Sequence, residues 1–501
     1  MTTHQPRILG IAASLRNARW GRGGDHLILE LAGCPDKAAL MAYLTRQSEL
    51  HLENFIQAGR AEGLDFKVIA ATLRKKSGTI GLSNSEIALA AALWSAVQLG
   101  AAIDHISLSE YFAPHGRIRH EAQLKERLRE ADGIILSGPV YFGDRGSLAE
   151  SLITLIASDA DLRRDLRGRL YGGIAVGAKR NGGQETTLIY QMMDMLDLGW
   201  LAVGNDSETT AQYGGTGHAG DVGTMHKDMY GIDTSMGLGR RMAQVLAPLC
   251  CDARTSDPPR ALFLILQDDQ SGLGRREAEA MAERAGGRLQ ARILDLSGSD
   301  ISRCIACDIC PTHVGLDKDY RCTITAASDP LPQLHTALLD HDLIVPVLVT
   351  SRRRSDLIGV YQSFVERTRY LRRSDYIWSD LVVAPMILQE SGSLDTYPIR
   401  AMTSFIRHHT VMSRPILGVR GADGVQNRLD MDDALADALT AAGRLTAGRL
   451  HLHSQTARRY NPVGYVLSSE KDAEDERQNR RDQMRSQRES DLLQKAAARL
   501  A

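Results

Sequence analysis

The sequence predicts an α/β protein made of two doubly wound domains in tandem, each built around a parallel sheet. Short apolar segments alternate with helical segments in the first half of the chain, and the second half repeats this order. Strands that alternate with helices form parallel sheets covered by helices on both faces. A polar segment with two prolines, residues 251–260, separates the halves and suits a linker. A chain of 501 residues is long enough for two hydrophobic cores.

Five strands are expected in each half, because these segments are short, apolar and bounded by turn residues. The expected strands of the first half are residues 7–13, 101–108, 132–138, 172–178 and 200–205. Those of the second half are residues 261–266, 289–296, 342–350, 380–388 and 415–419. Alanine-rich and leucine-rich segments favour helices. The expected helices are residues 85–100, 276–287 and 357–371.

Two further segments complete the predicted organisation. A helical insertion of about residues 20–82 interrupts the first domain, and a tail dense in both charge signs, residues 455–501, forms an exposed helix or a disordered end. The predicted domains are therefore residues 1–250, residues 260–454 and this tail.

The composition excludes some classes of partner. The chain is 43% hydrophobic and 24% charged with a net charge of −1, so no global field attracts nucleic acid or anionic lipid. No apolar run approaches the roughly 20 residues that span a bilayer, and MTTHQPRILG lacks the apolar core of a signal peptide. We therefore expect a cytoplasmic protein with no nucleic-acid or membrane partner, in which thiols stay reduced.

Polar donors follow the first strand, at the edge of the sheet where ligands bind. Ser14, Arg16 and Asn17 supply a hydroxyl, a guanidinium and an amide. The next helix begins only near residue 84, where Ser83, Asn84 and Ser85 are candidate N-caps. Together these side chains suit a phosphate. The insertion between them would act as a lid over the ligand or as an extra packing layer.

Two further loops follow the third and fourth strands. The segment GPVYFGDRGSLAES, residues 138–151, offers the flat side chains of Tyr141 and Phe142, and KRNGGQETT, residues 179–187, offers adjacent glycines and an amide. Each signal is weak, because such glycines also occur in ordinary turns. Their position after consecutive strands predicts one pocket.

The segments ILGIAASLRN, SNSEIALAAAL, ADGIILSGPVYFGDRGSLAESLI and VGAKRNGGQETTL resemble the flavodoxin-like NAD(P)H-dependent FMN reductases, and more narrowly their iron–sulfur flavoprotein branch. The resemblance covers most of residues 7–247. It implies that Ser14, Arg16, Ser83, Asn84 and Ser85 hold the FMN phosphate. It implies further that the isoalloxazine is lined by Pro139, Val140, Tyr141, Phe142 and Gly143, and that its pyrimidine edge meets Asn181, Gly182, Gly183 and Gln184.

Three of the seven cysteines lie at three-residue spacing in CIACDICP. The pattern C-x2-C-x2-C is typical of iron–sulfur ligation, whereas structural zinc more often uses two separated pairs. We predict a [4Fe–4S] cluster on Cys304, Cys307, Cys310 and Cys322, with zinc or unmetallated thiols as the alternatives. Should Cys322 not be a ligand, His313 is the next candidate. The resemblance points the same way, because iron–sulfur flavoproteins place a cysteine loop here.

The second domain is expected to lack FMN. Asp268 and Asp269 occupy the place of the phosphate donors, and each carboxylate beside a phosphate is unfavourable by roughly 1 kcal/mol even at high dielectric.

The resemblance and the cysteine pattern together imply an FMN-dependent oxidoreductase that uses NAD(P)H and relays electrons through the cluster to a small-molecule substrate or a redox partner protein. The alternatives are a dedicated flavin reductase or oxidase of one small organic substrate, and a non-enzymatic redox sensor or electron carrier. The two halves could form an internal pseudo-dimer, and the chain could also form a homodimer. No catalytic residue is assigned: Tyr213, His218 and His226 lie near the expected flavin edge, as proton donors or structural hydrogen-bonding groups.

Overall fold

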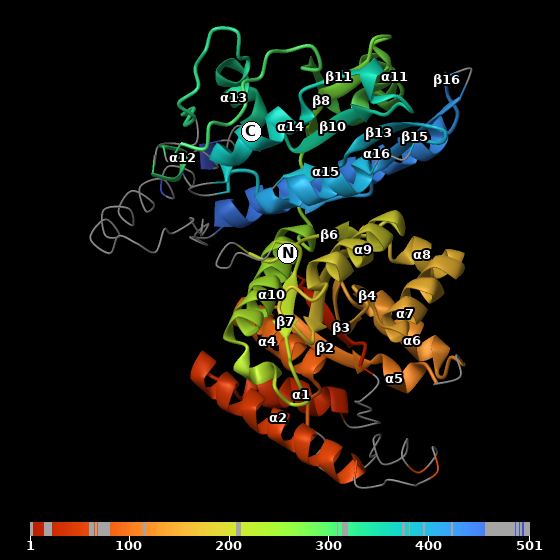
Figure 1. Ribbon diagram of the computed structural model, residues 1–501, viewed down its shortest axis with the longest axis vertical. Helices are drawn as coiled ribbons and strands as arrows, with labels where there is room; N and C mark the ends of the chain where they lie inside the picture. The colour runs from red at the N-terminus through yellow and green to blue at the C-terminus, as the bar shows by residue number, and fades with distance from the viewer. Residues whose placement is uncertain are drawn as a thin grey trace. The chain divides into compact units, whose positions relative to one another are not determined.

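A computed structural model shows two compact units, residues 4–250 and residues from 251 onward (Figure 1). The residues that it describes are 4–14, 23–59, 65, 68, 81–113, 117–206, 212–307, 309–312, 319–372, 376–379, 381–393, 396–421 and 424–455, with isolated positions near the C-terminus. Each unit is considered by itself.

The first unit is built on a mostly parallel sheet. Its strands are β1 (Arg7–Ala12), β2 (Ala102–Ser107), β3 (Gly133–Tyr141), β4 (Asp144–Arg145), β5 (Leu170–Gly177), β6 (Leu201–Ala202) and β7 (Gly215–His218). The main strands lie in the order β2-β1-β3-β5, and both β6 and β7 pair with the far side of β5. Counting β6 and β7 as one broken strand gives the order 2-1-3-4-5, which is that of the flavodoxin-like fold.

Helices cover both faces of this sheet. They are α4 (Asn84–Gln98), α5 (Leu108–Tyr111), α6 (Glu121–Glu130), α7 (Ser147–Ser158), α8 (Ala160–Asp165), α9 (Gln184–Asp197) and α10 (Met229–Leu249). Successive residues of β5 point to opposite faces: a Cβ at Gly172 would meet Leu238 of α10, whereas one at Gly173 would meet Leu188 of α9. Helix α10 packs on α4, so these two helices share one face. The sheet is therefore doubly wound.

The described part of the insertion packs against this first face. It forms α1 (Gly23–Ala32) and α2 (Lys37–Gly59), and both contact α4. Trp94 of α4 donates from Nε1 to the carbonyl oxygen of Cys34 at 2.8 Å, and Lys37 pairs with Asp233 of α10 at 2.6 Å. The described helices of the insertion thus pack on α4 and α10, and a lid over the ligand stays a prediction. Most of residues 60–80 lie outside the described part of the chain.

The second unit repeats the strand order of the first. Its strands are β8 (Arg260–Asp269), β9 (Gln290–Asp295), β10 (Leu343–Val349), β11 (Leu357–Gly359), β12 (Val382–Val383), β13 (Met386–Glu390), β14 (Val411–Met412), β15 (Ile416–Gly421) and β16 (Gly424–Val425). The parallel strands follow the order β9-β8-β10-β13-β15, with β12 beside β10 and β14 beside β12. This order is again 2-1-3-4-5.

The helices of the second unit are α11 (Leu273–Ala285), α12 (Ile309–Thr312), α13 (Leu331–Leu339), α14 (Tyr361–Arg367), α15 (Tyr397–Phe405) and α16 (Arg428–Gln455). Two ion pairs join α11 to α16, from Arg428 to Glu277 at 2.6 Å and from Arg284 to Asp432 at 2.8 Å.

Most predicted strands are present, and the differences occur where the chain breaks a strand. The segment 200–205 forms only β6, and its strand resumes at β7 in a glycine-rich stretch that carries no strand pattern. Segment 380–388 is divided into β12 and β13 beside Pro385, which has no amide hydrogen for a ladder. The helix predicted at residues 357–371 is wrong at its start, because residues 357–359 form β11. The tail beyond residue 455 lies almost wholly outside the described residues.

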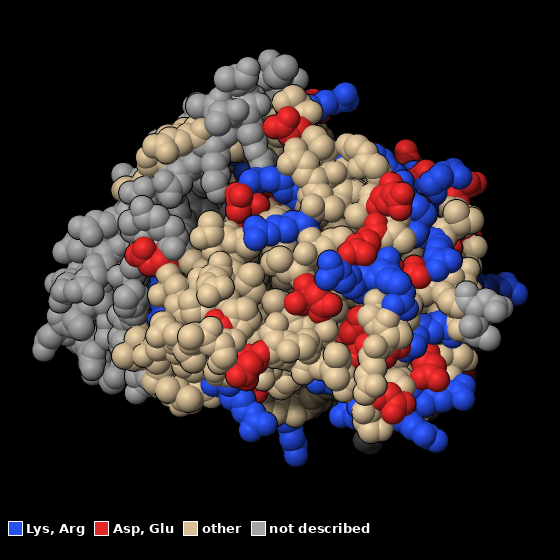
Figure 2. Space-filling model, turned by 90° about the horizontal axis from the view of Figure 1, so that it is seen from above, with Lys and Arg blue, Asp and Glu red and all other residues tan. Residues whose placement is uncertain are grey.

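Among the described helices, none combines the length and apolar character that crossing a bilayer requires. On the face seen in Figure 2, acidic and basic side chains are interspersed over the described surface. This mixture agrees with the net charge of −1.

Candidate functional site

A strained aromatic hairpin stands at the carboxyl end of the first unit's central strand. Strands β3 and β4 pair through Val140 with Arg145 and Tyr141 with Asp144, so Phe142 and Gly143 form the two-residue turn. Both have positive φ, 53° and 82°, as a type I′ turn requires, but this position normally holds asparagine or glycine. Tyr141 is 51% exposed and Phe142 is fully exposed. A bulky residue with this backbone conformation is an outlier of the kind found at ligand sites.

The loop after β5 closes against this hairpin. Gly183 has φ of 100°, and a Cβ there would lie 2.6 Å from the Cα of Gly143. The absence of a side chain at Gly183 is therefore what lets the two loops touch at the N-terminus of α9. Of the residues predicted to line the flavin, Gly183 thus approaches Val140 and Gly143 of the hairpin that carries Tyr141 and Phe142. Asn181 and Gly182 precede Gly183 in the same loop.

Gln184 has a supporting position in the structure. It is buried, its Oε1 accepts from the backbone N–H of Gly182 at 2.7 Å, and its Nε2 donates to the carbonyl oxygens of Lys179 and Gly217 at 2.7 and 3.0 Å. These bonds brace the 179–184 loop against β7. A flavin contact of this side chain stays a prediction.

Arg180 also braces this loop, and sequence reasoning did not single it out. Its guanidinium donates to Asp228 and to the carbonyl oxygen of Thr216 and lies 4.9 Å from the ring centroid of Tyr230. The carboxylate of Asp228 also accepts from the backbone N–H of His218 at 2.7 Å. This bond fixes the backbone of His218, which is one of the three predicted proton donors. Of the others, Tyr213 is buried and burial lowers the pKa of His226.

The N-terminus of α4 lies at the same edge of the sheet. Ser83 donates its backbone N–H and its hydroxyl to Glu86 Oε2, each at 3.1 Å, in a capping box. Asn84 donates to the carbonyl oxygen of Asp221 at 2.9 Å and accepts from the N–H of Met225 at 3.2 Å. Ser14, just beyond the end of β1, and Ser85, in the first turn of α4, are both buried. Arg16, the other predicted phosphate donor, lies outside the described residues.

A buried acidic cluster supports this helix end. Glu86 is fully buried, its Oε1 lies 3.6 Å from Nε2 of His105, and His105 is buried in β2. Glu110 of α5 lies close enough to Glu86 to be affected by its charge. Burial raises the pKa of Glu110 to about 7; the charge of Glu86 adds to this effect and Arg127 opposes it.

We expect Glu110→Gln to make the first unit more stable at high pH. The folded-state pKa lies above the ordinary value of 4.5. The contribution of this carboxyl to the free energy of unfolding is therefore fully present below pH 4.5 and is lost as the pH rises through 7. Relative to the wild type, the free energy of unfolding of the variant should be higher by about 2 kcal/mol at pH 8 and unchanged at pH 4.5. Urea unfolding at the two pH values measures the difference. An equal effect at both would show that the carboxyl does not titrate as stated.

A second prediction concerns the strain at Phe142. Replacing it by glycine should stabilise the FMN-free protein by about 1 kcal/mol, because an L-residue in the left-handed region is disfavoured by that order. The same change should weaken FMN binding, since it removes an exposed ring from the predicted flavin site. Thermal unfolding with and without FMN separates the two effects. If both midpoints rise together, the ring does not contact flavin.

The four cysteines lie in the second unit on the segment between β9 and α13, after the carboxyl end of β9. None of the four forms a disulfide bond, and all have intermediate exposure. Ala306, between the first two, has φ of 52°, which turns the backbone within the triplet. In the part of the chain that the structure describes, no three of these sulfurs lie within 4.8 Å of one another. Their donor chemistry, a set of thiolates, suits an iron–sulfur cluster.

A buried arginine fastens both ends of this cysteine loop. Arg367 of α14 is 1% exposed and pairs with Asp329 at 2.5 Å. Its guanidinium also donates to the carbonyl oxygens of Ser302 at 3.1 Å and Ile324 at 3.3 Å. Ser302 precedes Cys304, and Ile324 follows Cys322.

Tyr320 completes this network. Its hydroxyl accepts from Arg367 and donates to the Ile324 carbonyl oxygen at 3.0 Å. Removing one partner of a buried ion pair costs about 3–5 kcal/mol, so these contacts hold the cysteine-bearing segment firmly on the unit's core.

Residues 66–210 match the NADPH-dependent FMN reductase family. An iron–sulfur flavoprotein of Methanocaldococcus jannaschii is 40% identical over 126 residues, which are 25% of this chain and 63% of that protein. An iron–sulfur flavoprotein of Methanosarcina thermophila is 30% identical over 130 residues, 25% of this chain and 61% of that protein. The chain thus spans about three fifths of the length of the curated relatives that it matches.

Among solved structures, a WrbA-like flavodoxin from Agrobacterium tumefaciens aligns with 48% of this chain and 97% of its own, at 12% identity and a TM-score of 0.26. The strand order, and not this likeness, defines the fold. The first unit therefore contains a flavodoxin-like region similar to NADPH-dependent FMN reductases.

Proposed function

We propose that this protein is an NAD(P)H-dependent FMN oxidoreductase that passes electrons through a [4Fe–4S] cluster. The observation that carries the proposal is the exposed, strained Tyr141–Phe142 hairpin held against Gly183, within the region that matches the FMN reductase family.

The residues of the first unit fit FMN. The hairpin offers two exposed aromatic surfaces, and the close approach of Gly183 to Gly143 places the N-terminus of α9 beside them. The N-terminus of α4 carries Ser83, Asn84 and Ser85 at the end of the sheet where an anion is favoured. In the structure the Ser83 hydroxyl and the Asn84 amide donate to Glu86 and Asp221, so FMN would have to replace these bonds. Bound there, FMN would accept a hydride from NAD(P)H and release electrons singly.

Several side chains of the first unit hold the loop and the helix that would surround the flavin. Gln184 and Arg180 keep the loop at the flavin edge in place through the bonds described above. Glu86 fixes the first turn of α4 by accepting from Ser83, and the α1 and α2 layer packs behind that helix.

The second unit is proposed to lack FMN. Asp268 is 2% exposed, and both of its carboxylate oxygens accept from the backbone N–H of Gly274, at 3.1 and 3.0 Å, in the first turn of α11. A carboxylate therefore stands where the helix end would otherwise bind a phosphate. Asp269 pairs with Arg420 at 2.6 Å. This unit instead presents the loop with Cys304, Cys307, Cys310 and Cys322, which we propose as the cluster ligands.

Anaerobic stopped-flow kinetics of the full chain test the proposal. Adding NADPH or NADH should bleach the flavin band first, and the cluster absorbance should follow. If NAD(P)H turnover with a small organic acceptor proceeds equally fast without the cluster, the chain is a dedicated reductase. If both groups are bound but NAD(P)H does not reduce them, it is an electron carrier or sensor, and the proposal fails.

A further inference from the structure

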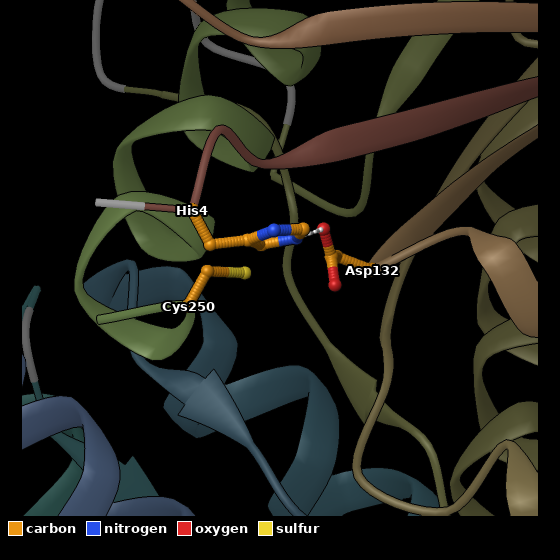
Figure 3. Close-up of side chains that lie close together, drawn as sticks. All are labelled: His4, Asp132 and Cys250. Atoms are coloured by element: carbon orange, nitrogen blue, oxygen red, sulfur yellow. Dashed lines mark hydrogen bonds and ion pairs between the residues drawn. The ribbon is translucent and has the colours of Figure 1, made fainter. Parts of the chain in front are cut away.

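Three side chains from separate elements of the first unit converge at the edge of the sheet opposite the candidate flavin site. His4 precedes β1, Asp132 directly precedes β3, and Cys250 follows α10. Nδ1 or Nε2 of His4, a carboxylate oxygen of Asp132 and Sγ of Cys250 lie within 4.8 Å of one another. Figure 3 shows the imidazole and the thiol side by side, both directed toward the carboxylate.

The backbone positions of these residues are fixed by the fold. Strands β1 and β3 are neighbours with Ile8 opposite Gly133, so the residues before them lie together. The backbone N–H of Asp132 donates to the carbonyl oxygen of Arg7 at 2.9 Å. The N–H of Cys250 donates to the Leu246 carbonyl oxygen at 2.8 Å. The site thus joins the beginning, middle and end of the unit.

The carboxylate of Asp132 is oriented before any ligand arrives. Oδ1 accepts from the guanidinium of Arg169 at 3.1 Å, and Oδ2 accepts from the backbone N–H of Arg7 at 2.9 Å. Oδ2 also lies 2.8 Å from Nε2 of His4. Hydrogen bonds of this kind to a ligating carboxylate are typical outer contacts of metal sites.

We propose that His4, Asp132 and Cys250 bind a zinc ion. Imidazole, carboxylate and thiolate are the three ligand types of zinc in proteins, and three protein ligands leave a fourth position for water. The ion would replace the proton between His4 and Asp132, and the charges of thiolate and carboxylate would balance its own. The imidazole is 58% exposed and the carboxylate 13%, so an ion can reach the site. Because the ligands are far apart in sequence, binding would close a long chain segment and stabilise the unit.

Zinc alone is the probe for this site. The reduced full chain is dialysed to equilibrium against micromolar zinc, and the metal bound per chain is counted in the wild type and in His4→Gln, Cys250→Ser and Cys251→Ser. The adjacent Cys251 is the matched control, because it does not belong to the group. Any zinc held by the cysteine loop of the second unit is common to all four proteins and cancels in the comparison.

We expect the wild type and Cys251→Ser to hold one more zinc ion per chain than His4→Gln and Cys250→Ser, with affinity reduced at least tenfold in those two variants. Cobalt should give a thiolate charge-transfer absorbance per chain that is larger in the wild type and in Cys251→Ser than in Cys250→Ser, because cobalt on the cysteine loop contributes equally to all of them. His4→Gln changes an exposed side chain, so it tests the site even if Cys250→Ser fails to fold. Equal zinc content in all four proteins, or an equal loss in Cys251→Ser, would overturn the proposal.

Discussion

Cys307→Ser should remove most of the iron and sulfide from the protein while FMN stays bound. Serine oxygen is a poor substitute for thiolate sulfur, which iron–sulfur clusters require, and Cys307 is the middle residue of the predicted ligand triplet. The candidate flavin site lies in the other unit and is built from different segments. NAD(P)H should still bleach the flavin band of the variant, but single electrons should no longer reach an acceptor that is reduced through the cluster.

Cys34→Ser is the matched control for this experiment. Cys34 is a buried thiol of the first unit that donates to the carbonyl oxygen of Glu30 at 3.4 Å. The control should keep its full iron content. If Cys307→Ser also keeps its iron, the triplet does not ligate the cluster. Cys322→Ser tests the fourth ligand in the same way, and retention of iron there would favour His313, which lies outside the described residues.

Gly183→Ala should weaken FMN binding at least tenfold, which is about 1.4 kcal/mol. The new methyl group would lie 2.6 Å from the Cα of Gly143, closer than real contacts allow, so the aromatic hairpin or the α9 end must move. Its φ of 100° adds backbone strain of about 1–2 kcal/mol. Fluorescence titration of the flavin-free protein with FMN measures the affinity.

Gly168→Ala is the matched control, because it separates the effect of backbone strain from the effect of pushing the two loops apart. Gly168 also has positive φ, 75°, but a Cβ there meets nothing within 4 Å. This control should lose stability by about 1–2 kcal/mol and bind FMN as tightly as the wild type. Equal losses of affinity in both variants would mean that the contact between the two loops plays no part in binding.

Strands with continuous apolar runs could be predicted from the sequence, because burial on both faces leaves a direct compositional signal. Segments such as β1 and β10 are examples. The β7 part of the fifth strand of the first unit could not, since β7 consists of glycine, threonine and histidine and lies beside β5 through pairing. The positive φ of Phe142 contradicts turn preferences, so the sequence predicted a flat surface there but not the strained turn that presents it.

The supporting contacts of the site were also beyond sequence reasoning. Gln184 was expected at the flavin, and its hydrogen bonds to Gly182, Lys179 and Gly217 depend on how the loop folds back on β7. Arg367 lies 45 positions beyond Cys322, and nothing in its local pattern indicates a buried ion pair that fastens the cysteine loop. Long-range contacts of this kind arise from tertiary packing, which periodicity does not record.

Our central proposal is that the first unit holds FMN, whereas the second unit lacks FMN and holds the cluster. Flavin, iron and sulfide measured per chain in anaerobically purified full-length protein, together with its visible spectrum, test this claim most directly. We expect one FMN per chain, with iron and sulfide in the proportions of a single [4Fe–4S] cluster. Two flavins per chain, or zinc without iron in the cysteine loop, would contradict it.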